Sequence, residues 1–179
     1  KTLFSITLPL LSAAALTLGA AGGAVAAPGN DASNGNGPPC PIGQNVVVHL
    51  KRHINDLQGA HVAVRLATLL ASPDDPEDPP PPGQAVNVTL FLTLQGPRLV
   101  DEAQPQDLVF GSDPDTLGMW VENFLTAGGK IYVCPLCGKE IGLAAADLLY
   151  AEDYPDQVKI ANPTEIKQTF LCADQVLDF

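Results

Sequence analysis

The sequence predicts one α/β domain with a mainly parallel, five-stranded sheet that helices cover on both faces. Short runs of β-branched residues alternate along the chain with amphipathic segments of helical period, which is typical of β-α-β units. The second run, 85–94, is almost continuously apolar, as expected of a strand that is buried on both faces. Right-handed crossovers would bring successive strands into one parallel sheet.

The expected elements follow in the order β-α-β-α-α-β-α-β-α-β. Strands are predicted at 45–52, 85–94, 130–134, 157–162 and 174–179. Helices are predicted at 55–72, 98–103, 113–127, 144–150 and 162–173. Asp113 and Asn162 are the expected N-caps of the two helices that start with a proline. The segment 72–84 is an acidic, proline-rich loop that neither a helix nor a strand can include.

The N-terminal segment has the pattern of a secretory signal peptide. Lys1 precedes an uncharged apolar run, and small residues ending in Ala24-Val25-Ala26 follow it, so cleavage is expected after Ala26. Residues 27–43 are rich in Gly, Asn and Pro and are expected to form a flexible leader. The folded domain is therefore expected at 44–179, in a protein that is periplasmic or secreted.

Charge and motifs limit the classes of function. The chain carries 20 acidic and 9 basic residues, for a formal net charge of −11. Such a charge disfavours nucleic acids and anionic membranes as partners, because both repel an acidic chain, so no membrane association is expected after signal cleavage. The sequence contains no G-x-G-x-x-G, P-loop, G-x-S-x-G or H-E-x-x-H motif, and no cofactor is expected.

The four cysteines carry the chemistry that the sequence offers. They are Cys40, Cys134, Cys137 and Cys172, and an oxidising compartment permits disulfides among them in three pairings. Cys134 and Cys137 form a Cys-x-x-Cys pair at the carboxyl end of the third predicted strand, where ligands bind in parallel sheets. If a helical turn follows Pro135, its amides would point toward the first thiol and favour the thiolate. Cys172 is expected to be buried, and Cys40 is a resolving thiol, a tether or a residue without a role.

A metal site is disfavoured, because structural zinc needs four ligands and one Cys-x-x-Cys supplies two. The histidines His49, His53 and His61 are expected to be surface or half-buried residues. Arg98 follows the second strand, so it is a candidate for anion contact at the edge that carries Cys134. An ordinary surface arginine explains its position equally well.

Three segments, "FLTLQGPRLV", "VENFLTAGGKIYVCPLCGKEIG" and "VKIANPTEIKQTFLCADQVLDF", give the chain a family resemblance. Over roughly residues 45–179 it resembles the DsrE/DsrF-like superfamily, close to its YchN-like branch. The resemblance implies a flavodoxin-like three-layer sandwich and a homo-oligomer, commonly a trimer or hexamer. It also implies sulfur relay, in which Cys134 receives sulfane sulfur as a persulfide and passes it to a partner thiol. Cys137 matches the second cysteine of the branch.

Three hypotheses about function therefore stand. The first is a sulfur carrier or sulfurtransferase with Cys134 as nucleophile, Cys137 as accessory thiol and a protein thiol as sulfur donor or acceptor. The second is a dithiol–disulfide redox protein that uses Cys134 and Cys137 together. The third is a non-enzymatic, oligomeric binding module whose cysteines are structural.

Overall fold

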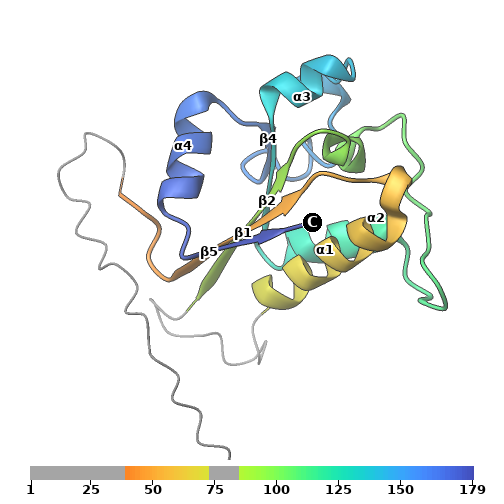
Figure 1. Cartoon of the computed structure of the whole chain (residues 1–179), viewed down its shortest axis with the longest axis horizontal. Coiled ribbons are helices and arrows are strands. Elements are labelled where there is room, and N and C mark those ends of the chain that lie inside the picture. Colours follow the sequence, from red (N-terminus) through yellow and green to blue (C-terminus); the bar gives the residue numbers. More distant parts are fainter. Residues whose placement is uncertain (1–38, 73–84) are drawn as a thin grey trace, which may run out of the picture. The chain divides into compact units, whose positions relative to one another are not determined.

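A computed structural model describes residues 39–72 and 85–179 (Figure 1). The described residues form a five-stranded sheet in which every strand is parallel to its neighbours, in the order β4-β3-β2-β1-β5. The predicted α/β class and parallel sheet are confirmed. The predicted signal peptide, most of the predicted leader and the acidic loop from residue 73 onward lie outside the described residues.

The elements follow the predicted order with small shifts at their ends, except that a short helix at 135–140 is added to the predicted ones. The strands are β1 (Gln44–Leu50), β2 (Val86–Leu92), β3 (Lys130–Val133), β4 (Val158–Ile160) and β5 (Gln175–Asp178). The α-helices are α1 (Leu57–Ala71), α2 (Leu117–Thr126), α3 (Pro135–Glu140) and α4 (Pro163–Leu171). The short helices predicted at 98–103 and 144–150 are 3-10 turns, η2 (Gly96–Val100) and η3 (Ala145–Asp147). A third 3-10 turn, η1 (Ile54–Asp56), directly precedes α1.

The main hydrophobic core lies between the sheet and the helices α1 and α2, which lie side by side on one face (Figure 1). Alternate strand residues point toward these helices, because side chains in a strand alternate between the two faces. The strand residues in this core include Val48, Leu50, Leu90, Leu92, Ile131 and Val133. The helix α2 contributes its buried residues Leu117, Val121, Phe124 and Leu125 to this core.

The helix α4 covers the opposite face of the sheet (Figure 1). The ring of Phe170 on this helix packs edge-on against Phe91 of β2, with centroids 5.1 Å apart. From β1 to β4 the chain steps outward one strand at a time, and α4 then carries it back past β1 to β5. A right-handed crossover in the reverse direction has to run over the other face. The strand order therefore reverses between β1 and β5.

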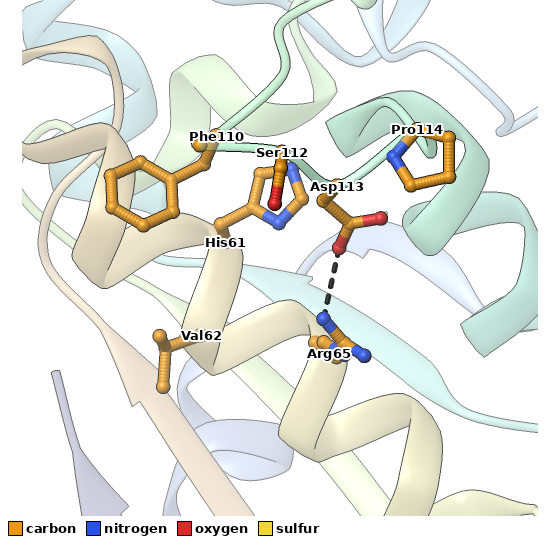
Figure 2. Close-up of a pocket in the computed structure, with 8 residues that line it drawn as sticks. His61, Val62, Arg65, Phe110, Ser112, Asp113 and Pro114 are labelled. Carbon is orange, nitrogen blue, oxygen red and sulfur yellow. Dashed lines mark hydrogen bonds and ion pairs between the residues drawn. The ribbon is translucent and has the colours of Figure 1, made fainter.

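The two predicted N-caps have different outcomes. Asn162 caps α4 as predicted, with its side chain accepting hydrogen bonds from the amides of Thr164 and Glu165. Asp113 as the cap of α2 is wrong, because the Thr116 hydroxyl accepts the bond from the amide of the third helical residue. The carboxylate of Asp113 instead accepts from Arg65 on α1 at 2.9 Å (Figure 2) and from the amide of Asp115 at 3.1 Å, so it makes a tertiary ion pair and a local turn before the helix.

A disulfide joins Cys40 to Cys172, across 132 positions of the sequence. Cys172 is buried, as predicted, at the end of α4. Residues 39–43, which the composition assigns to the flexible leader, are held against the fold by this bond and by hydrogen bonds such as that from the Asn87 amide to the Ile42 carbonyl. The sequence left the pairing open, and the geometry of the fold selects this one.

Candidate functional site

Cys134 and Cys137 are free thiols at the carboxyl edge of the sheet, and both are half-buried. Cys134 directly follows β3, and its amide donates to the Leu92 carbonyl at 2.9 Å, so pairing with β2 continues to this residue. Cys137 comes one turn later in α3. The structure therefore places both cysteines where the sequence predicted, at the end of the third strand and in the turn that follows.

The helix α3 does not contact the first thiol in the expected way. Cys134 occupies the N-cap position, but its side chain accepts no capping hydrogen bond from the amides of this six-residue helix, all of which is described. The helix ends at a turn in which Gly142 has a φ of +79°, in the left-handed region that favours glycine. This requirement explains the glycine eight residues after Cys134 in physical terms.

The environment of Cys137 favours its neutral form. Burial raises the pKa of its thiol, a hydrogen bond from the Leu94 amide lowers the pKa, and the hydrogen-bonded Cys134 thiol raises it again, for a net increase. A raised pKa means that Cys137 keeps its proton at neutral pH. Cys137 is thus suited to donate a hydrogen bond to the neighbouring sulfur rather than to act as the attacking thiolate.

The loop after β2 forms one wall of the site. Leu94 has a φ of +53°, which is uncommon for a residue with a side chain and costs on the order of 1–2 kcal/mol. In this conformation the Leu94 amide points toward the Cys137 thiol, and the Leu94 side chain is exposed. Gly96 follows, and a Cβ there would lie 2.3 Å from the Leu50 carbonyl oxygen, so glycine lets the loops after β1 and β2 approach closely.

Arg98 lies in η2, immediately after β2, and is half-buried. Its guanidinium donates to the Gln95 side chain at 2.9 Å, and among the described residues no hydrogen bond joins it to either free cysteine. The buried imidazole of His53 is nearby: its pKa is lowered by burial first and by the charge of Arg98 second, while Asp101 opposes both. Arg98 as an anion contact stays a prediction.

The expectation for the histidines is wrong for two of the three. His53 and His61 are buried, at 1% and 3% exposure. The His61 ring lies 6.3 Å from the ring of Phe110 in the loop before α2, and the charges of Arg98 and Asp101 act on His53, so tertiary neighbours surround both imidazoles. Neither ring nitrogen of His53, nor Nε2 of His61, has a hydrogen-bond partner within the described part of the chain. His49 is half-buried, as expected, with 22% of its side chain exposed.

A hydrogen-bonded chain that the sequence analysis missed lies on the α4 face, at the same edge of the sheet. The Asp178 carboxylate is 2.8 Å from Nδ1 of His49, and Nε2 of His49 is 2.7 Å from the Thr93 hydroxyl. Lys51 also binds the Asp178 carboxylate. All four residues stand at or just after the carboxyl ends of strands, and that shared position is the signal that could have found them.

A separate groove lies between α1 and the loop before α2. Figure 2 shows its wall, where His61 and Arg65 of α1 face Phe110, Ser112 and Asp113 of the loop. The groove is lined by none of the cysteines. It is therefore not part of the thiol site.

Two further searches cover the described residues only. Residues 39–72 and 85–179 contain no group of three or more His, Cys, Asp or Glu side chains that could hold a metal ion. In the same two ranges, every helix is too short or too polar to span a bilayer.

Comparison with solved structures identifies the fold. The chain is similar to the YchN protein of E. coli, with a TM-score of 0.50 and 17% sequence identity, over 76% of this chain and 99% of that one. The fold is thus that of a YchN-like, flavodoxin-like α/β sandwich, as the resemblance implied. No family model matches the chain, and no curated protein sequence matches it.

Proposed function

We propose that the protein carries sulfane sulfur as a persulfide on Cys134. The observation that carries this proposal is the division of the four cysteines: Cys40 and Cys172 are oxidised, whereas Cys134 and Cys137 are free at the carboxyl edge of the sheet. A persulfide carrier needs a free thiol, which Cys134 and Cys137 have and the two disulfide-bonded cysteines lack. The YchN-like fold supports the same class of function.

The two thiols divide the work. The Cys134 thiolate attacks the outer sulfur of a donor persulfide; a new S–S bond forms on Cys134 while the donor's S–S bond breaks and its electron pair leaves with the donor thiolate. Cys137, protonated because of its raised pKa, donates a hydrogen bond to the sulfur of Cys134. Transfer to an acceptor thiol repeats the same displacement in reverse.

The surroundings of the site fit a protein thiol as donor or acceptor. Leu94 and Leu136 lie beside the cysteine pair and are 61% and 73% exposed. Exposed apolar side chains around a reactive group favour a macromolecular partner over a small polar one, because their burial stabilises the encounter. The proposal includes assembly of the chain into a homo-oligomer, a trimer or hexamer, which light scattering of the mature protein measures.

The experiment uses the mature protein and a small-molecule persulfide as donor. Intact mass and peptide mapping without reductant should find one added sulfur atom on Cys134, and none in a Cys134→Ser variant. The matched control is Cys137→Ser, which removes the second thiol and should still accept sulfur. Equal sulfur uptake by the parent and Cys134→Ser would falsify the proposal.

Dithiol–disulfide exchange is the second candidate, because Cys134 and Cys137 are close enough for their side chains to hydrogen-bond. In that reaction Cys134 and Cys137 form a disulfide while a substrate disulfide is reduced to two thiols. Titration of the parent in glutathione buffers separates the candidates. A reversible Cys134–Cys137 disulfide within the range of known exchange proteins favours the redox function, and two thiols that stay reduced favour sulfur carriage.

A further inference from the structure

We propose that Thr93, His49 and Asp178 form a proton relay that takes the proton from the Cys134 thiol. This inference rests on the proposed role of Cys134 as nucleophile. It assigns a function to three side chains that neither the cysteine motif nor the fold explains. Thr93 follows β2 at the position beside Cys134 in the register of the sheet. His49 and Asp178 act through Thr93 and are positioning residues.

The hydrogen bonds of the relay fix its direction. The Asp178 carboxylate binds both Lys51 and His49, and Lys51 first and His49 after it lower the pKa of this carboxyl, so it is ionised at neutral pH. An ionised carboxylate only accepts hydrogen bonds, so Nδ1 of His49 carries the proton at 2.8 Å. In the neutral imidazole Nε2 is then the acceptor, and the Thr93 hydroxyl donates to it at 2.7 Å.

The packing holds the imidazole in this orientation. Its ring lies against Phe91 of β2 and Phe170 of α4, with centroids 5.8 and 6.5 Å away. The titratable groups that face it are Asp178 and, through that carboxylate, Lys51; the two aromatic rings carry no charge. His49 and Asp178 are paired residues on β1 and β5, at the point where the strand order reverses.

The register of the sheet brings Thr93 and Cys134 together. Leu92 of β2 is paired with Val133 of β3, and Thr93 and Cys134 are the next residue on each strand. The residues before them, Leu92 and Val133, have their side chains in the core. The side chains of Thr93 and Cys134 therefore point to the opposite face, the one that α4 covers. Neighbouring parallel strands are about 4.8 Å apart. The register therefore places the Thr93 and Cys134 side chains on one face at one edge. In this structure the Thr93 hydroxyl bonds His49, and among the described residues no hydrogen bond joins it to the thiol, so the proton transfer requires the S–H group to turn toward this oxygen.

The transfer is balanced in protons and charge. The S–H bond of Cys134 breaks and its proton passes to the Thr93 oxygen, while the original hydroxyl proton passes to Nε2 of His49. The products are a thiolate and an imidazolium whose second N–H remains bound to Asp178. This is the arrangement that activates a nucleophile through a base that a carboxylate orients, with a hydroxyl between base and thiol.

Alkylation kinetics test the relay without any sulfur transfer. The rate of carbamidomethylation of Cys134 by iodoacetamide is measured from pH 5 to 10 in a Cys137→Ser background, so that one thiol reacts. Without assistance a thiol with the ordinary pKa is only about 1% thiolate near pH 6.5. We expect the parent to react at least about tenfold faster than Thr93→Val at that pH, and the two rates to converge above pH 9.

Three further variants separate the relay from a structural role. Thr93→Ser keeps a hydroxyl and should restore the low-pH reactivity, and His49→Gln should lose it. Thr89→Val, the same substitution on the same face of β2, is the matched control and should behave as the parent. A Thr93→Val profile equal to that of the parent overturns the relay, and so does a Thr93→Ser profile as slow as that of Thr93→Val.

The proposed function and the relay fail in different ways. If the alkylation profiles follow the expectation but the parent accepts no sulfur from a persulfide, the relay stands and sulfur carriage is wrong. If the parent accepts sulfur on Cys134 while Thr93→Val and the parent share one alkylation profile, sulfur carriage stands and the relay is wrong.

Discussion

The disulfide between Cys40 and Cys172 should contribute a large part of the stability of the domain. It closes a loop of 132 positions, and the chain-entropy relation gives about 5 kcal/mol for a loop of this length at 25 °C. Measured contributions are smaller when the unfolded chain keeps structure, so we expect the free energy of unfolding to fall by about 2–5 kcal/mol in a Cys40→Ser/Cys172→Ser variant.

Urea unfolding followed by far-ultraviolet circular dichroism measures this loss. With a slope of about 1–3 kcal/mol per molar urea, the midpoint should fall by on the order of 1–3 M. The control is Cys134→Ser/Cys137→Ser, which removes two sulfur atoms but no cross-link and should shift the midpoint by less than half as much. Parent protein treated with a thiol reductant should unfold like the double variant. A midpoint that moves by less than about 0.3 M would refute the argument from loop closure.

Three more outcomes follow from the structure. Thr116→Ala should destabilise the domain by about 1 kcal/mol through loss of the α2 cap, as chemical denaturation would show; an unchanged free energy of unfolding would argue against Thr116 as the cap. Phe124→Ala should cost about 3–5 kcal/mol in the same assay, because its ring is fully buried between α2 and the sheet; a loss below 1 kcal/mol would contradict that packing. The pKa of Glu165 is lowered, first by its hydrogen bond with Lys159, so the ionised carboxylate stabilises the fold above pH 4.5 and this stabilisation is lost as the pH falls through the lowered pKa. Glu165→Gln should flatten the dependence of the unfolding free energy on pH below pH 4.5. An unchanged slope would argue against a stabilising Lys159–Glu165 ion pair.

The parts of the fold that the sequence predicted are those with a strong local signal. The strands of β-branched residues, the amphipathic α1 and the N-cap Asn162 all depend on neighbours within a few positions, and each is confirmed. Asp113 shows the limit of this reasoning. Its pattern is that of a cap, but its carboxylate binds Arg65, 48 positions earlier, as well as the amide of Asp115, and no local pattern contains the contact with Arg65.

The candidate site divides in the same way. Cys134 and Cys137 were found because a Cys-x-x-Cys after a strand is a compact motif in sequence. His49, Thr93 and Asp178 are spread over 130 positions, and they meet only because β5 pairs with β1 and β1 with β2. The order of the strands has to be known before these three residues can be placed at one edge of the sheet. The burial of His53 and His61 was missed for a related reason, since tertiary packing and not periodicity decides it.

The disulfide and the thiol site are connected through the end of the chain. Cys172 lies between Phe170 of α4, which packs against the His49 ring, and Asp178 of β5, which binds Nδ1 of that ring. Strand β5 is at the edge of the sheet and is largely exposed, so few buried contacts of its own hold it in register. The cross-link at Cys172 ties this segment to Cys40, four positions before β1. The oxidised pair thereby helps to position the groups from which Cys134 would obtain its thiolate.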